Sequence, residues 1–124
     1  MGKLLKIFFV VFLLIACRKN NTSYLSELVN YKGTYLGDEV IFNSFYIDAV
    51  VSIDIDDNGD VTVDITLNNE NIYFYTDSNY MTKLSDKKYE IQRADYYIFL
   101  DFSNGFYFVY KEIGKEVSGN LIKQ

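Results

Sequence analysis

The chain has 124 residues, and its 12 lysine and arginine residues are outnumbered by 17 aspartate and glutamate residues, which gives a formal net charge of −5. Nucleic-acid binding requires a basic surface that neutralises phosphates, so this composition argues against a nucleic-acid partner. The chain contains no histidine, which excludes a Ser-His or Cys-His nucleophilic pair and an imidazole metal site. We therefore expect a protein that is not an enzyme.

The first sixteen residues have the order of an export signal. Lys3 and Lys6 precede a continuous apolar run over residues 7–15, and the small residue Ala16 follows it. A transmembrane helix needs about 20 apolar residues, and basic residues end this run well before that length. We therefore expect residues 1–16 to be a signal peptide that is removed.

The only cysteine of the chain, Cys17, directly follows this run. The residues Leu14-Ile15-Ala16-Cys17 resemble the lipobox of bacterial lipoproteins, in which an aliphatic and a small residue precede a cysteine that is acylated and becomes the new N-terminus. The resemblance implies a lipid on Cys17, and two or more acyl chains hold a protein stably on a membrane. An ordinary cleaved secretory signal and an uncleaved anchor, in which Cys17 has no role, are the alternatives.

The resemblance also implies a location in the bacterial cell envelope, with the protein anchored to a membrane by its lipid. Arg18, rather than an aspartate, follows the cysteine, which is similar to lipoproteins that are sorted to the outer membrane. We expect the lipidated cysteine and a tether over residues 17–23 and one domain over residues 24–124. Removal of residues 1–16 would leave 108 residues, enough for one domain, and would change the net charge from −5 to −7 because two lysines leave with the signal.

The elements expected in the domain are one short helix followed by strands. Between Ser23 and Asn30 the apolar residues have helical spacing, with Ser23 as a possible N-cap. Residues 47–55 and 61–67 alternate between apolar and polar side chains, which predicts two strands. A three-residue loop, Asp57-Asn58-Gly59, would place Ile55 opposite Val61 and keep one face apolar, with the glycine in the left-handed region.

The same loop geometry is expected at Ser103-Asn104-Gly105, between strands over residues 98–102 and 106–110. Shorter strands are predicted over residues 72–76, 80–84, 89–93 and 117–122. This pattern predicts an all-β fold, a single antiparallel up-and-down meander. Because no proline blunts an edge strand, we expect the meander to close into a small barrel.

A short helix, the glycine-containing stretch "KGTYLG" and a meander together resemble lipocalin-like small β-barrels. The resemblance implies an interior that could hold a small apolar ligand. Packing must come from apolar side chains, since a lipidated Cys17 leaves no disulfide, and 12 tyrosines with 10 phenylalanines supply them.

The stretch "DIDDNGDVTV" has the spacing of the first half of an EF-hand calcium loop. The candidate ligands are Asp54, Asp56, Asn58 and Asp60. Position twelve, where a bidentate glutamate is required, is Ile65 instead, and the flanks alternate as strands. The alternative is that these residues form the solvated outer face of a hairpin with a tight turn. The paired carboxylates lie on an open hairpin face, which gives no cleft for a glycosidase.

Charge is unevenly distributed along the chain. No basic residue occurs between Lys32 and Lys83, whereas ten acidic residues lie there. If the strand pairing is right, one sheet face carries five aspartates: Asp48, Asp54, Asp56, Asp60 and Asp64. This face could attract a basic protein, as in small acidic envelope barrels that bind lysozyme, or it could serve solubility alone.

The last predicted hairpin has apolar side chains on both faces. Tyr97, Phe99 and Tyr107 lie opposite the set that includes Leu100 and Phe108. One set must form the interior, and the other is either covered by the short helix or exposed as a binding patch.

The leading hypothesis is a membrane-anchored, non-enzymatic binding or interaction module of the bacterial envelope. The alternatives are a carrier of a small apolar ligand and a weak calcium-binding surface domain.

Overall fold

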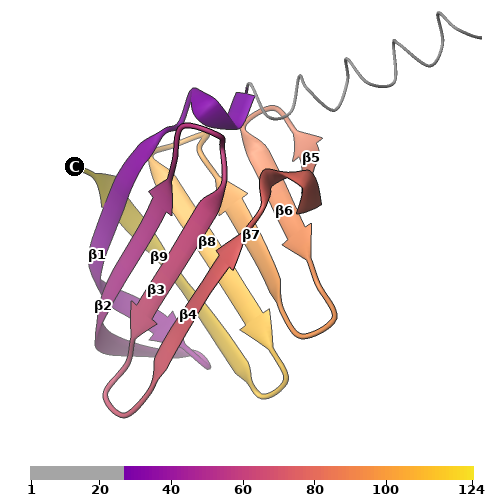
Figure 1. The fold of residues 1–124 in the computed structure, drawn as a ribbon. Helices are drawn as coiled ribbons and strands as arrows, with labels where there is room; N and C mark the ends of the chain where they lie inside the picture. The colour runs from indigo at the N-terminus through magenta and orange to yellow at the C-terminus, as the bar shows by residue number, and fades with distance from the viewer. Residues whose placement is uncertain (1–26) are drawn as a thin grey trace, which may run out of the picture.

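The computed structural model describes residues 27–124, which form one nine-stranded antiparallel sheet (Figure 1). The predicted signal peptide, Cys17 and the tether lie outside these residues. The strands are β1 (Gly33–Phe42), β2 (Phe45–Ile55), β3 (Val61–Thr66), β4 (Asn71–Thr76), β5 (Met81–Ser85), β6 (Lys88–Gln92), β7 (Tyr97–Asp101), β8 (Phe106–Glu112) and β9 (Lys115–Lys123). Their order is β4-β3-β2-β1-β9-β8-β7-β6-β5, so the predicted antiparallel meander is confirmed.

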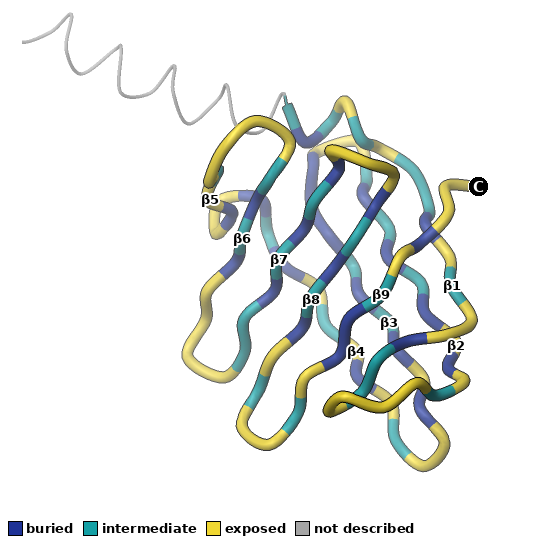
Figure 2. Tube along the Cα trace, turned by 180° about the vertical axis from the view of Figure 1, so that it is seen from behind, coloured by how far each residue is buried: buried dark blue, intermediate teal, exposed yellow. Residues whose placement is uncertain are grey.

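The sheet curls so that its concave face forms the core. Buried and exposed positions alternate along the strands (Figure 2). On β2 and β3 the alternating aliphatic residues are fully buried, among them Val51, Ile53, Val63 and Ile65. Ile98, Leu100 and Phe108 are the buried set of the last predicted hairpin. Burial of each such side chain stabilises the fold by roughly 1.5–3 kcal/mol.

Both predicted three-residue loops are present. Ile55 pairs with Val61 across the first loop, and Gly59 has φ +78°. In the second loop Gly105 has φ +75°, and Asp101 and Tyr107 pair across this loop. Left-handed backbone is accessible to glycine without steric strain, which explains a glycine at both positions.

The turn between β1 and β2 was not predicted. Phe42 pairs with Phe45, so only Asn43 and Ser44 connect the strands, and both have positive φ. This is the pattern of a type I′ hairpin, which usually contains glycine. Asn43 is fixed by its contacts with the neighbouring hairpin, because its side chain donates to Gly114 O at 3.1 Å and accepts from Glu116 N at 2.9 Å.

The expected closed barrel is wrong, because no ladder joins β4 to β5. Each neighbouring pair in the sheet is antiparallel, so strict alternation along nine strands leaves β4 and β5 running in the same direction. Only Asp77–Tyr80, including the 3₁₀ turn η1 (Ser78–Tyr80), separates them. A parallel pair of β4 and β5 would need a crossover connection of about a dozen residues between them. β5 therefore continues in the direction of β4, and the sheet remains a curled half-barrel (Figure 1).

The helix predicted over residues 23–30 is not supported. In its described part only residues 27–29 have helical backbone, and a turn follows, with hydrogen bonds from Asn30 N to Glu27 O and from Tyr31 N to Leu28 O. Leu28 is fully buried and packs into the end of the core. Within residues 27–124 no helix is long and apolar enough to cross a membrane.

Candidate functional site

Three of the four predicted calcium ligands, Asp54, Asp56 and Asp60, accept hydrogen bonds from within the protein through their carboxylates. The Asp56 carboxylate accepts from the backbone amides of Asn58 at 2.9 Å and Asp60 at 3.0 Å, which fixes the turn before Gly59. On β2, Asp54 accepts from the Thr34 hydroxyl at 2.7 Å.

Asp60 is only 8% exposed, so the expectation that it joins a solvated face is wrong. Its carboxylate accepts from the Tyr75 hydroxyl at 2.5 Å and from Ser78 N at 2.9 Å. These contacts tie the β2–β3 loop to the end of β4 and to η1. Burial alone would raise the pKa of Asp60, but the hydrogen bonds from Tyr75 and Ser78 outweigh it, so the pKa is lowered. The same hydrogen bond raises the pKa of Tyr75 to about 12.

Between residues 27 and 124, no three or more histidine, cysteine, aspartate or glutamate side chains are placed to hold a metal ion. Two of the four predicted ligands, Asp56 and Asp60, organise backbone amides instead. This arrangement favours a turn-forming role for these carboxylates over calcium coordination.

Acidic side chains that remain on the surface gather on the convex side of β1–β4. We define this acidic face by five residues: Asp38, Glu39, Asp48, Asp54 and Asp64. A β-bulge in β1 shapes it, because the pairing with β2 shifts between Gly37 and Glu39 and the recorded pairs with β9 skip from Leu36 to Ile41. The bulge exposes two consecutive side chains, Asp38 and Glu39.

Glycine is required at the bulge by a close approach of two strands. A Cβ atom on Gly37 would lie 2.5 Å from Leu121 Cδ2 and 3.4 Å from the backbone oxygen of Asn120. Leu121 is buried, so it has little room to move. Gly37 therefore allows β9 to pack against β1 where the alternation is broken.

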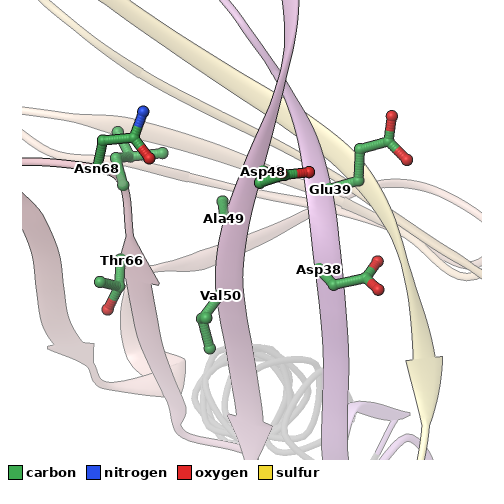
Figure 3. A pocket seen from close by; sticks show the side chains of 8 residues that line it. Asp38, Glu39, Asp48, Ala49, Val50, Thr66 and Asn68 are labelled. Atoms are coloured by element: carbon green, nitrogen blue, oxygen red, sulfur yellow. The ribbon is translucent and has the colours of Figure 1, made fainter.

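The bulge also places two like charges at directly opposite positions on β1 and β2. Glu39 pairs directly with Asp48, which points toward it in Figure 3. Neither carboxylate has a hydrogen bond or ion pair among the described residues 27–124, and no basic residue occurs in residues 33–82. Like charges at directly opposed positions destabilise a sheet. A bound cationic group would relieve this repulsion.

Two hollows flank the bulge. One, of about 540 Å³, lies over β2 beside Asp48 and Val50 (Figure 3). The other, of about 260 Å³, is bordered by Tyr46 and Tyr107, and Asp38 and Glu39 line both. Exposed aromatic side chains occur on β2 and β4: Phe45 is 73% exposed and Tyr46 74% at the start of β2, and Tyr73 is 65% exposed on β4.

The predicted partner residues divide between two surfaces. Asp48 and Asp64 lie on the acidic face, and the Asp64 carboxylate accepts from Asn71 Nδ2 at 2.8 Å. Tyr97, Phe99 and Tyr107 lie half-buried on the convex side of β7 and β8, beyond β9. Tyr97 donates to Glu90 at 3.0 Å. Of these three, only Tyr107 borders the bulge.

An apolar hollow of about 410 Å³ opens at the end of the half-barrel near the N-terminal turn. Its walls include Tyr31, Tyr35, Phe102, Phe106 and Ile122. Tyr31 stacks on Phe102 with ring centroids 4.0 Å apart, and Tyr35 meets Phe106 edge-on at 4.6 Å. This hollow is the place where the structure could admit a small apolar ligand.

Sequence reasoning missed Asp38, Glu39 and Tyr46 as site residues. The available signal was the break of alternation in "YLGDEV", where a glycine and two acidic residues interrupt apolar positions.

Comparison of the chain with protein-family models, with curated protein sequences and with solved structures finds no match.

We predict that Asp60→Asn lowers the free energy of unfolding by about 2 kcal/mol at pH 7, because a buried acceptor of charge-assisted hydrogen bonds is lost. The pKa of Asp60 is lowered in the folded state. The contribution is therefore fully present above the unfolded-state pKa of about 4 and disappears as the pH falls through the lower folded-state value. Urea unfolding at a series of pH values measures both effects.

Asp86→Asn, at an exposed turn, serves as the control and should change stability by less than about 0.5 kcal/mol. A stability difference between wild type and Asp60→Asn that stays constant from neutral to acidic pH would contradict the assignment.

Proposed function

We propose that the protein is a lipid-anchored lipoprotein of the bacterial envelope that acts as a non-enzymatic binding module for a basic protein. The observation that carries the partner class is the unrelieved Glu39–Asp48 pair within a region that has ten acidic and no basic residues. Anchoring is supported by the sequence Leu14-Ile15-Ala16-Cys17 after a charged and apolar leader. Arg18, which follows the cysteine, favours sorting of the lipoprotein to the outer membrane.

The positions of Glu27 and of the β1–β2 turn support a particular orientation of the protein on the membrane. Glu27 is held by Lys83 at 2.7 Å and by the Tyr89 hydroxyl at 3.0 Å, so the described chain begins at one defined end of the half-barrel. Ten residues from Cys17 to Glu27 reach at most about 35 Å. The Phe42–Phe45 turn lies at the other end of β2. A lipid on Cys17 would thus leave Tyr46 and the bulge directed away from the membrane.

Charge and aromatic rings together favour a protein partner. Lysine or arginine side chains of the partner would enter the hollows beside Asp38, Glu39 and Asp48, whose linings contain no lysine or arginine of this chain. Exposed aromatic residues are typical energetic anchors of protein interfaces. Phe45 and Tyr46 sit on a turn that Asn43 fixes, so ordering them on binding costs little entropy.

A second candidate function is the transport or storage of a small apolar ligand. The aromatic hollow beside Tyr31, Phe102 and Phe106 supports it, since ligand sites are commonly concave and lined by aromatic side chains. Its position near Glu27 would place it at the membrane-facing end.

The anchor is tested by labelling. Cells that express the full chain and are fed labelled palmitate should incorporate label into the wild type and none into Cys17→Ser, because the thiol is the proposed attachment point. Incorporation is read by gel fluorography of the immunoprecipitated protein. Equal label in both proteins, or none in the wild type, would end the lipoprotein proposal.

The partner class is tested with lysozyme as a basic probe protein. We expect the full chain in detergent to bind it with an affinity that falls steeply as ionic strength rises, because exposed charges are screened. The double variant Glu39→Gln/Asp48→Asn should bind about tenfold more weakly. The same variant should melt no lower than wild type, since a repulsive pair has been removed.

Asp86→Asn removes one acidic charge from a turn outside the acidic face and should bind as wild type does. Equal affinity of Glu39→Gln/Asp48→Asn and wild type would show that the acidic face is not the docking surface.

A further inference from the structure

The interruption between β4 and β5 contains a further hollow that the proposed function does not use. We call this region the seam and define it as residues 75–80 together with the facing turn of residues 93–96. The hollow has a volume of about 300 Å³, and Tyr75, Thr76, Asp77 and Tyr80 line one side of it. Arg93, Ala94, Asp95 and Tyr96 line the other.

One of the residues that line this hollow, Thr76, has a buried hydroxyl group without a partner. Thr76 is 3% exposed, and its Oγ1 has no hydrogen bond to any described residue. Buried polar groups are almost always satisfied, so an unpaired hydroxyl in the wall of a hollow indicates that something else supplies the bond. A hydroxyl can both donate and accept a hydrogen bond, so Thr76 does not restrict the charge of the group that binds it.

Three further groups in the walls have unused hydrogen-bonding capacity. The guanidinium of Arg93 lies 3.7 Å from the centroid of the Tyr80 ring and hydrogen-bonds the Tyr80 side chain, which engages only part of its five N–H groups, and no carboxylate of residues 27–124 forms an ion pair with it. The side chain of Asp95 has no hydrogen bond among the same residues. Asp77 Oδ1 accepts from Asn79 N at 2.8 Å, and its second oxygen has no such bond.

These groups restrict the chemistry of a ligand. Arg93 can only donate hydrogen bonds, whereas Asp77 and Asp95 can only accept them. A carboxylate or phosphate would suit Arg93 but would be repelled by two aspartates, and an ammonium ion would suit the aspartates but not Arg93. A neutral molecule with several hydroxyl groups satisfies all of them, because each hydroxyl donates and accepts.

The aromatic lining favours a ligand with an apolar face. Tyr96 packs against Phe74 with ring centroids 4.3 Å apart and remains half-exposed beside the hollow. A pyranose ring presents C–H groups on one face and hydroxyls around its edge, which matches a tyrosine face bordered by donors and acceptors. We propose that the seam binds one unit of a neutral saccharide through Thr76, Arg93 and Asp95.

The test uses the full chain in an amine-oxide detergent, since many common detergents carry sugar headgroups. The probes are glucose, galactose, mannose, N-acetylglucosamine, cellobiose and chitobiose, each screened by saturation-transfer difference NMR and then by calorimetry. At least one should bind with a stoichiometry of one and a dissociation constant below about 10 mM.

Substitutions locate the site. Thr76→Val keeps the shape and removes the hydroxyl, so it should weaken binding about tenfold while the melting temperature stays equal or rises, because an unpaired buried polar group has been removed. Asp95→Asn should also weaken binding. The matched control is Thr62→Val on the convex side of β3, and it should bind as wild type does.

Three results would overturn the proposal. The first is the absence of binding by every saccharide probe up to about 10 mM. The second is wild-type affinity in Thr76→Val and Asp95→Asn. The third is saturable binding of glycine, acetate or methylammonium in the absence of saccharide binding, which would identify a charged ligand instead.

Discussion

The four residues between β4 and β5 are the constraint on which the rest of the structure depends. They are too few for the crossover that a parallel pair requires, so β4 and β5, which run in the same direction, are not joined by a ladder. Side chains hold this edge instead of backbone hydrogen bonds. Asp60 connects Tyr75 and Ser78, and the rings of Phe74, Tyr96 and Tyr110 stack behind them. The seam is thus stabilised by polar and aromatic contacts while it leaves a hollow open.

The two halves of the open sheet also differ in charge. All ten acidic residues of positions 33–82 belong to β1–β4 and their connections, and basic residues occur only before and after that stretch. The β1 bulge then places Glu39 opposite Asp48. The bulge, Gly37 and the fixed Asn43 turn therefore organise one surface, at the end of the sheet opposite Glu27.

Local patterns of the sequence predicted what depends on local rules. The period of two in residues 47–55 and 61–67 gave β2 and β3 their faces, and the glycines at 59 and 105 gave the loop geometry, because left-handed backbone selects glycine. β1 was not delimited, since its bulge breaks the period. The Asn43-Ser44 turn was missed because it contains no glycine.

Features that depend on distant contacts could not be read in this way. Closure of the barrel was expected because edges need cover, whereas strand number and the short η1 connection decide it. Asp60 reads as one more solvated aspartate in the sequence, and only its contacts with Tyr75 and Ser78, fifteen and eighteen residues away, bury it. The acidic bulge arises from a register shift that no local period reveals.

Backbone amide exchange, followed by NMR on the full chain after transfer to deuterated water, tests the open seam most directly. If the edges are unpaired, alternate amides of β4 and β5 exchange quickly, whereas those of β3, which is paired on both sides, are protected throughout. Continuous protection along Asn71–Thr76 and Met81–Ser85, equal to that of β3, would mean that the edges are hydrogen-bonded and would contradict the account.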